Sequence, residues 1–309
     1  MVTNIVLLAA LVASDPPPRS AGIHFIDVGQ GSAALLITRS GDAVLVDSGP
    51  AAGAEAVLAA LGLWEVETLS LWVHTHFDAD HIGAFAPVIR GLDGRLGSED
   101  DIEVEQLWDR GFEAPLPDSE AFALYASMSA ERGRAAAWGR RFVAPGLVVE
   151  AIQLDAPLAE AGENDLGLAL CVELDGLRAL LPGDLSAARL QLAAAHCAPI
   201  DVLWASHHGA RDGISAAVLE ATTPWLTVIS AGHDNGYCHP AALSLARLHD
   251  HQVAILDAAG LLPGGRCDPI YSALGPAHRV LGGSLWVASS GETWIGDPGG
   301  WLEAGLAPR

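Results

Sequence analysis

Five side chains that could bind metal ions lie within eight consecutive residues of this 309-residue chain. The segment 69–85 reads LSLWVHTHFDADHIGAF: an apolar, β-forming run ends at a loop that contains His74, His76, Asp78, Asp80 and His81. Imidazole and carboxylate groups hold zinc, manganese or iron in proteins. A plain polar loop after a strand could also contain such residues, but five in so short a stretch are rare by chance. The segment therefore predicts a metal site at the carboxyl end of a strand.

Three later segments place further candidate groups directly after apolar, strand-forming runs. They are Pro182-Gly183-Asp184, Ser206-His207-His208-Gly209, and the stretch 231–240 with Asn235 and His239. Strand-like runs alternate with helical segments, which predicts an α/β fold whose site lies along one edge of the sheets. Because no repeat or linker follows residue 20, we interpret residues 21–309 as one catalytic domain.

A glycine motif near the N-terminus suggests a second kind of site. Gly29-x-Gly31-x-x-Ala34 follows a strand-like run and has the shape of a dinucleotide fingerprint, with Asp47 near the place of a ribose-binding acid. That fingerprint needs a crossover helix after the glycines. Residues 34–38 and 43–47 are instead two short apolar runs across a Gly-Asp turn, which predicts a hairpin and excludes the nucleotide site.

The segment 118–142 has helical composition and contains Arg132, Arg134, Arg140 and Arg141. We expect a helical insertion around residues 112–145. Its arginines could form a solvated helix face. They could equally form a lid at the mouth of the site, where Arg132 and Arg140 would meet an anionic substrate, and the sequence leaves both possibilities open.

Composition narrows the range of substrates and mechanisms. The 16 basic residues are all arginine, and the formal net charge is −22. The lack of lysine excludes Schiff-base and lysine-nucleophile mechanisms. The lack of a GxSxG elbow disfavours a serine hydrolase. An acidic surface repels phosphate backbones, so we expect a small-molecule or short anionic substrate and not long duplex nucleic acid. The sequence gives no indication of the oligomeric state.

The four cysteines, Cys171, Cys197, Cys238 and Cys267, have no CxxC spacing and indicate neither a zinc knuckle nor a redox pair. Cys171 lies in an apolar run, where we expect a buried free thiol. Cys238 beside His239 could line the site or be a bystander.

Residues 1–20 form an apolar and proline-rich segment. The run 5–13 resembles the core of a signal peptide with a cut near Ser14, but no basic residue precedes it. It is too short to span a bilayer, and no other stretch is typical of a transmembrane segment. We favour a cytoplasmic protein and keep export open in case residues 1–14 are a signal peptide.

Taken in order, these motifs resemble those of the metallo-β-lactamase superfamily. The resemblance is carried by His76-x-Asp78-x-Asp80-His81-x-Gly83, Gly183-Asp184, His207-His208-Gly209 and Asn235…His239-Pro240. Asp27-Val28-Gly29-Gln30-Gly31, Val46-Asp47-Ser48-Gly49 and Asn164-Asp165 are most similar to the ComEC-type branch, the hydrolase domain of bacterial DNA-uptake channels. The resemblance spans about residues 23–295. It implies a four-layer αββα sandwich with one or two divalent metal ions, zinc or manganese, at the edge of two sheets.

The family signature HxHxDH can be read in two registers here. Counting from His74 leaves Ala79 where a histidine should stand, whereas counting from His76 puts Asp78 in the second histidine position. The second register fits Gly83 and is the one we favour, which makes His74 a neighbour of the site. Residues 82–183 contain no histidine, so Asn164, Asp165 or water could take the place of the usual third one.

The resemblance implies metal-assisted hydrolysis by an activated water. The implied ligands are His76, Asp78, Asp80, His81, Asp184 and His208. Asp80 would orient the water or accept its proton, His207 would face the substrate, and His239 beside Asn235 would stabilise the developing charge or protonate the leaving group. We expect Asp27 and Asp47 to brace loops and not to bind metal.

Three functions remain open at this point. The leading one is hydrolysis of a phosphodiester, such as a nucleotide or a short nucleic-acid end. A lactonase or another ester or amide hydrolase could use the same metals. A non-catalytic binding protein with a degenerate metal site is the third possibility, because the usual third histidine is missing.

Overall fold

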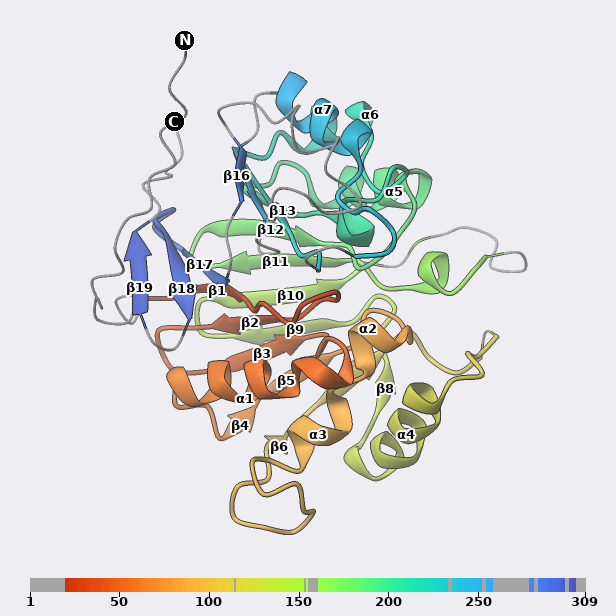
Figure 1. Cartoon of the computed structure of the whole chain (residues 1–309), viewed down its shortest axis with the longest axis vertical. Coiled ribbons are helices and arrows are strands. Elements are labelled where there is room, and N and C mark those ends of the chain that lie inside the picture. The colour runs from red at the N-terminus through yellow and green to blue at the C-terminus, as the bar shows by residue number, and fades with distance from the viewer. Residues whose placement is uncertain are drawn as a thin grey trace.

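Two β-sheets pack face to face, and helices cover the outer face of each sheet in this computed structural model (Figure 1). The structure describes residues 20–303 apart from 114, 153, 155–160, 233–234, 252–253, 258–277, 281–282 and 298–299. Except for Ser20, the N-terminal segment 1–20 therefore lies outside the described residues. The order of layers is helix, sheet, sheet, helix, so the predicted four-layer αββα sandwich is confirmed.

The first sheet has nine strands in the order β19-β18-β17-β1-β2-β3-β5-β7-β8. They are β1 (Gly22–Phe25), β2 (Ala34–Ile37), β3 (Ala43–Val46), β5 (Leu71–Val73), β7 (Leu107–Asp109), β8 (Ala135–Ala136), β17 (Ser284–Ala288), β18 (Thr293–Asp297) and β19 (Gly300–Glu303). Strands β2 and β3 pair antiparallel, as the predicted hairpin requires. No helix separates them, so the predicted hairpin is confirmed.

Helices α1 (Ala54–Leu63), α2 (Ala79–Ile82), α3 (Phe85–Ile89) and α4 (Glu120–Ser129) lie on the outer face of this sheet (Figure 1). A short parallel pair, β4 (Thr68–Leu69) and β6 (Glu103–Val104), lies beside them. The 3-10 turns are η1 (Ala51–Gly53), η2 (Ala130–Arg132), η3 (Asn164–Leu166) and η4 (Ser206–Gly209).

The second sheet has eight strands in the order β16-β15-β14-β13-β12-β11-β10-β9. They are β9 (Arg141–Ala144), β10 (Leu147–Ala151), β11 (Leu170–Leu174), β12 (Leu177–Leu181), β13 (Val202–Trp204), β14 (Leu226–Ile229), β15 (Ala254–Asp257) and β16 (His278–Val280). Helices α5 (Ala187–Cys197), α6 (Ala216–Thr222) and α7 (Ala242–Asp250) cover it. No helix among the described residues combines the length and the apolar character needed to cross a bilayer.

Both faces of the central strands are buried, which explains their continuously apolar sequences. In β3, Val44 and Val46 face the core between the sheets, whereas Leu45 packs under the helices. In β5, Trp72 points to the helix side. His74 packs on the same side, with its ring 4.9 Å from that of Tyr125, and lies in the core beside the helices.

The helix expected over 118–142 is much shorter, since α4 ends at Ser129. After η2, Gly133 adopts a left-handed conformation with φ 64°. A glycine in this conformation ends a helix because it turns the chain away from the helical path. The remaining residues then pair in β8 and β9, so a continuous helix was the wrong prediction for this segment.

Cys171 is not a free thiol, because it forms a disulfide with Cys197. Cys171 lies on β11 and Cys197 at the end of α5, with their Cα atoms 5.7 Å apart. The packing of α5 on the sheet brings them together. Cys238 is also disulfide-bonded, and Cys267 lies outside the described residues.

Candidate metal centre

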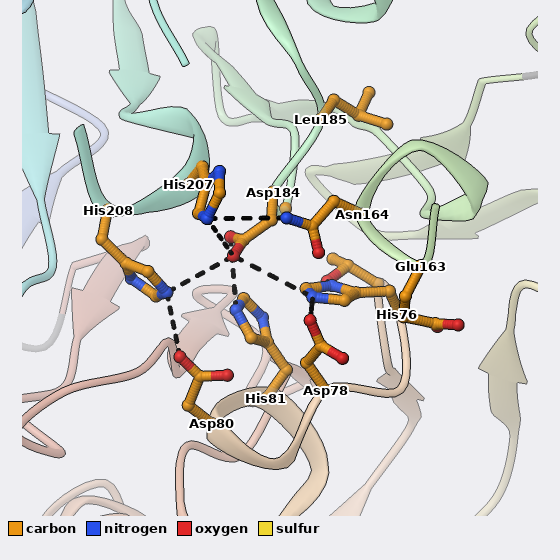
Figure 2. A network of polar contacts seen from close by, with 12 residues as sticks. His76, Asp78, Asp80, His81, Glu163, Asn164, Asp184, Leu185, His207 and His208 are labelled. Atoms are coloured by element: carbon orange, nitrogen blue, oxygen red, sulfur yellow. Dashed lines mark hydrogen bonds and ion pairs between the residues drawn. The ribbon is translucent and has the colours of Figure 1, made fainter. Parts of the chain in front are cut away.

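The carboxylate of Asp184 lies at the middle of a cluster of imidazole rings (Figure 2). One oxygen is 3.3 Å from His81 Nε2, and the other is 3.4 Å from His208 Nε2. The Nε2 atoms of His76 and His207 are each 4.0 Å from the second oxygen. Segments separated by more than a hundred residues thus converge on one buried carboxylate.

These residues follow strands that end at the same edge of the sandwich. Asp184 follows β12, and His207 and His208 follow the parallel neighbour β13. Gly183, with φ 57°, turns the chain so that Asp184 points inward. A Cβ at this position would lie 2.8 Å from the Thr75 side chain, so only glycine fits between the two sheets here.

The Gly29-Gln30-Gly31 motif builds the same edge from the other side. A Cβ on Gly31 would lie 2.4 Å from the Asp80 carbonyl oxygen, and Ser32 N donates a hydrogen bond of 3.0 Å to that oxygen. The glycine therefore allows the backbone to approach the metal-binding loop. This close approach accounts for the motif that resembled a nucleotide fingerprint.

Asp47 fixes the orientation of His81. Its fully buried carboxylate accepts hydrogen bonds from His81 Nδ1 at 2.7 Å, from Thr75 Oγ1 at 2.9 Å and from Thr75 N at 2.7 Å. A histidine that donates through Nδ1 presents an unprotonated Nε2 on its other side. Asp47 braces the site, as we expected, and holds His81 Nε2 toward Asp184.

Within the cluster, the buried Nε2 atoms of His76, His81 and His208 face carboxylate oxygens at 3.2–4.0 Å but make no hydrogen bond of good geometry. The Nδ1 atom of His208 lies 2.8 Å from the Ser230 carbonyl oxygen, and that of His76 lies 3.1 Å from Thr75 Oγ1. Buried polar atoms rarely lack partners unless another group, such as an ion, satisfies them. Rings that are held through Nδ1 and point Nε2 inward fit a metal centre.

Two groups of residues could each hold a cation. One consists of His76, His81 and Asp184, and the other of Asp80, His81 and His208. Within each group the candidate ligand atoms all lie within 4.8 Å of one another. The sequence placed all five residues among the metal ligands, and the structure brings them together. The donor set of imidazoles and carboxylates fits a divalent transition metal.

The charges of the cluster favour ionised carboxylates. Burial opposes ionisation of Asp184, but the neighbouring His81 and His208 outweigh it and hold its pKa well below the usual range. For His208, burial alone would lower the pKa, but the neighbouring Asp184 and Asp80 outweigh burial and raise the pKa to about 9. The pKa of Asp80 is also lowered, because hydrogen bonding to His208 and the charges of His81 and His208 outweigh burial.

The two predicted carboxylate ligands of the metal-binding loop differ in position. Asp80 Oδ2 lies 3.2 Å from His208 Nε2 and belongs to the second group. Asp78 Oδ2 lies 3.5 Å from His76 Nε2, and 43% of its side chain is exposed. Asp78 belongs to neither group, so its role as a ligand stays a prediction.

Of the two candidates for the position of the missing histidine, Asn164 faces the cluster. Its side-chain nitrogen lies 3.5 Å from His207 Nε2 (Figure 2). Asp165 instead accepts a hydrogen bond from Ser186 N, and its carbonyl oxygen accepts one from Arg189. Asp165 therefore braces the start of α5.

His207 and His239 lie where the centre opens to solvent. The His207 side chain is 31% exposed, and its ring lies 5.5 Å from that of His239. Burial, followed by His207 and His208, lowers the pKa of His239 to about 4, so this imidazole is neutral at neutral pH. The amide of Asn235 makes three hydrogen bonds within its own loop, to Gly232 O and to both His239 N and O. Substrate contact by His239 and Asn235 stays a prediction.

Arg132 and Arg140, which we expected in a lid over the site, make their described hydrogen bonds to other parts of the chain. Arg132 donates to the Met128 carbonyl oxygen and lines a hollow together with the acidic segment 97–105. Arg140 is exposed and donates to the Ala136 carbonyl oxygen. None of their described hydrogen bonds reaches the cluster, so a role for either residue in substrate binding stays a prediction.

Sequence reasoning missed an ion pair that supports the metal-binding loop. Arg110 binds Glu163 through two contacts of 2.8 and 2.6 Å, and Glu163 Oε1 also accepts a hydrogen bond of 2.8 Å from Phe77 N. Phe77 lies between His76 and Asp78, and the Arg110 guanidinium lies 4.4 Å from its ring centre. A lone arginine and a lone glutamate far apart in the chain gave no signal of this pairing.

Comparison with known proteins agrees with this geometry. A family model described as the metallo-beta-lactamase superfamily matches residues 26–233. Recombination protein 2 of Haemophilus influenzae is 25% identical over 241 residues, which are 77% of this chain and 27% of that protein. ComE operon protein 3 of Bacillus subtilis is 32% identical over 98 residues, which are 31% of this chain and 13% of that protein. The chain thus spans only a minor part of either relative.

Among solved structures, this chain is similar to CmlA, a diiron beta-hydroxylase from Streptomyces venezuelae. The two share 13% identity with a TM-score of 0.46, and the match covers 79% of this chain and 53% of that one. Similarity at this level says nothing about the activity of the chain.

Proposed function

The chain belongs to the metallo-beta-lactamase superfamily and is a metal-dependent hydrolase, and we propose that it cleaves phosphodiesters in nucleotides or short nucleic-acid ends. The observation that carries hydrolysis is the buried cluster around Asp184, with its three inward-facing Nε2 atoms. Similarity to Recombination protein 2, whose name refers to recombination of nucleic acids, supports a phosphodiester as the substrate. The resemblance to the ComEC-type branch supports it as well.

We assign one or two divalent ions, zinc or manganese, to the residues of the two groups. One ion would be held by His76, His81 and Asp184, or by Asp80, His81 and His208. If two ions bind, His81 Nε2 can coordinate only one of them, because Asp47 holds its Nδ1. Such ions lower the pKa of a bound water toward neutrality and polarise a phosphoryl oxygen. The carboxylates of Asp80 and Asp184 add oxygen donors, which shift preference from zinc toward manganese.

The remaining roles belong to side chains around the cluster. We assign Asp80, whose carboxylate lies 3.2 Å from His208 Nε2, to orienting the attacking water or accepting its proton. His207 lies half-buried at the opening and can donate a hydrogen bond to a phosphoryl oxygen. His239, behind it, is held by Asn235 and can contact the leaving group. Asp47 keeps His81 in its metal-binding tautomer.

The disulfides indicate the kind of compartment in which the protein is located. Cys171 and Cys197 are bridged, and Cys238 is also disulfide-bonded. Disulfides persist in oxidising compartments and are rare in the cytosol. We therefore infer an oxidising compartment, in place of the cytoplasmic location that we favoured from the sequence. Alkylation of Cys171 and Cys197 in the native protein without prior reduction would contradict this inference.

A substrate screen tests the proposed activity. The metal-loaded protein is offered bis(p-nitrophenyl) phosphate, single-stranded oligonucleotides, a panel of lactones and a β-lactam, each with added manganese or zinc. We expect phosphodiesters to be cleaved fastest and Asp184→Asn to abolish that cleavage. Faster turnover of lactones would support the ester-hydrolase alternative. Less than about half an equivalent of bound metal, with no hydrolysis, would support the third possibility, a non-catalytic binding protein with a degenerate metal site.

A further inference from the structure

A row of rings leads from the metal centre to solvent. His207 Nε2 lies 4.0 Å from Asp184, and the His207 ring meets the His239 ring edge-on with centres 5.5 Å apart. The Tyr237 ring stacks on His239 with centres 5.7 Å apart and planes inclined by only 18°. Tyr237 itself is 73% exposed. A large aromatic side chain therefore lies open at the mouth of the centre.

The backbone around Tyr237 is held in place by several independent contacts. Asn235 makes three hydrogen bonds that close the loop onto Gly232 and His239. Gly232 N donates a hydrogen bond of 2.9 Å to the side-chain oxygen of Gln30. Cys238, which directly follows Tyr237, is disulfide-bonded. Because the loop is braced, a ligand that meets the ring does not have to order it first, which favours binding.

The electrostatics of the chain make such a ring useful to a nucleic-acid hydrolase. With a formal net charge of −22, the protein offers little general attraction for phosphate backbones. Arg110, a buried arginine next to the metal-binding loop, is neutralised by Glu163. Affinity for a nucleotide must then come largely from the metal centre and from contacts with the base. Stacking of a base on an aromatic side chain strengthens binding by roughly 5- to 150-fold.

We propose that Tyr237 is a specificity-determining residue that stacks on a nucleobase next to the scissile phosphodiester. This inference rests on the proposed function and narrows its substrate class. The preferred substrates carry a base close to the cleaved bond, in contrast to simple alkyl phosphodiesters. The face of the ring opposite His239 receives the base.

Equilibrium binding tests the proposal independently of catalysis. Two short fluorescent single strands of equal length and charge are compared on the metal-loaded protein by anisotropy. One carries bases, the other is abasic, and both contain phosphorothioate linkages that slow cleavage. The variants are Tyr237→Ala and Tyr237→Phe, and Leu192→Ala serves as a control for loss of an exposed apolar side chain on α5.

The wild type should bind the base-bearing strand roughly 5- to 150-fold more tightly than the abasic strand. Tyr237→Ala should remove most of this preference and leave abasic binding unchanged, whereas Tyr237→Phe and Leu192→Ala should retain it. A preference that survives Tyr237→Ala, an equal loss for both strands, or no preference in the wild type would overturn the proposal. Bound metal and thermal melting are compared across the variants to show that each is folded.

The same proteins separate this proposal from the proposed function. If bases are preferred through Tyr237 but no phosphodiester is hydrolysed, the proposed activity fails and the stacking site stands. If phosphodiesters are hydrolysed equally well with and without bases by wild type and Tyr237→Ala, only the stacking site fails.

Discussion

Replacing Asp47 by asparagine should weaken metal binding without removing a ligand. The carboxylate accepts from His81 Nδ1 and Thr75 Oγ1 through one oxygen and from Thr75 N through the other. An amide has one oxygen and one NH2 group. Whichever way it turns, the NH2 group faces either the Thr75 N–H or His81 Nδ1, and the second arrangement forces the His81 proton onto Nε2.

The size of the effect follows from this geometry. A group that orients a metal-binding histidine contributes about 10- to 100-fold in metal affinity, or about 1.4–2.7 kcal/mol. Asparagine tolerates the left-handed backbone of Asp47, where φ is 57°, so the substitution does not add backbone strain. The loss should therefore reflect the hydrogen bonds and not a distorted loop.

Competition between the protein and a chromophoric chelator for zinc or manganese measures this change. Asp27→Asn is the matched control, because Asp27 braces its loop through a hydrogen bond of 3.1 Å from Gly29 N and makes no described contact with the cluster. Metal affinity should fall for Asp47→Asn and remain at the wild-type value for Asp27→Asn. Equal affinity of Asp47→Asn and wild type would refute the idea that Asp47 sets the tautomer of His81.

Three further perturbations test the site and the fold. Asp184→Asn should reduce metal affinity by more than about 100-fold and abolish hydrolysis with an unchanged circular dichroism spectrum, since it alters the central ligand; retained hydrolysis would exclude this role. Burial lowers the pKa of His24 from 6.5 to about 3, so the unfolded chain binds an extra proton below pH 6.5. As the pH is lowered from 6.5 toward 3, the free energy of unfolding should then fall by about 1.4 kcal/mol for each pH unit. In urea titrations His24→Gln should flatten this slope, and an unchanged slope would contradict the assignment. Replacing Cys171 and Cys197 by serine should lower the free energy of unfolding by about 3–4 kcal/mol for a loop of this length. Dithiothreitol should destabilise the wild type by more than the variant, because the disulfide of Cys238 can still be reduced in the variant; equal destabilisation of both proteins would contradict a contribution from the Cys171–Cys197 disulfide.

Local sequence patterns located the elements that carry the site. Strand-forming runs that end in polar residues placed His76, His81, Asp184 and His208 at one edge, because the turn after a strand is encoded by neighbouring residues. The register that starts at His76 agrees with the structure, in which His74 packs among aromatic rings on the helix side. The hairpin of β2 and β3 was equally readable, since its turn and both strands lie within fifteen residues.

Features that depend on packing between distant segments were not readable. Nothing near Cys171 indicates that α5 will place Cys197 beside it. Residues 133–142 have helical composition, but pairing with β10 in the second sheet draws their last residues into a strand. The Arg110–Glu163 pair joins positions 53 residues apart through a contact that forms only when both sheets are in place. Tertiary packing overrides local preference in each of these cases.

Anomalous diffraction from crystals grown with manganese or zinc shows directly whether metal binds at the Asp184 cluster. We expect one or two anomalous peaks within ligand distance of the His81 and His208 Nε2 atoms and the Asp184 carboxylate, and no peak there in Asp184→Asn. A loaded wild-type crystal without a peak at these atoms, or with its only strong peak elsewhere, would exclude a metal centre at this cluster.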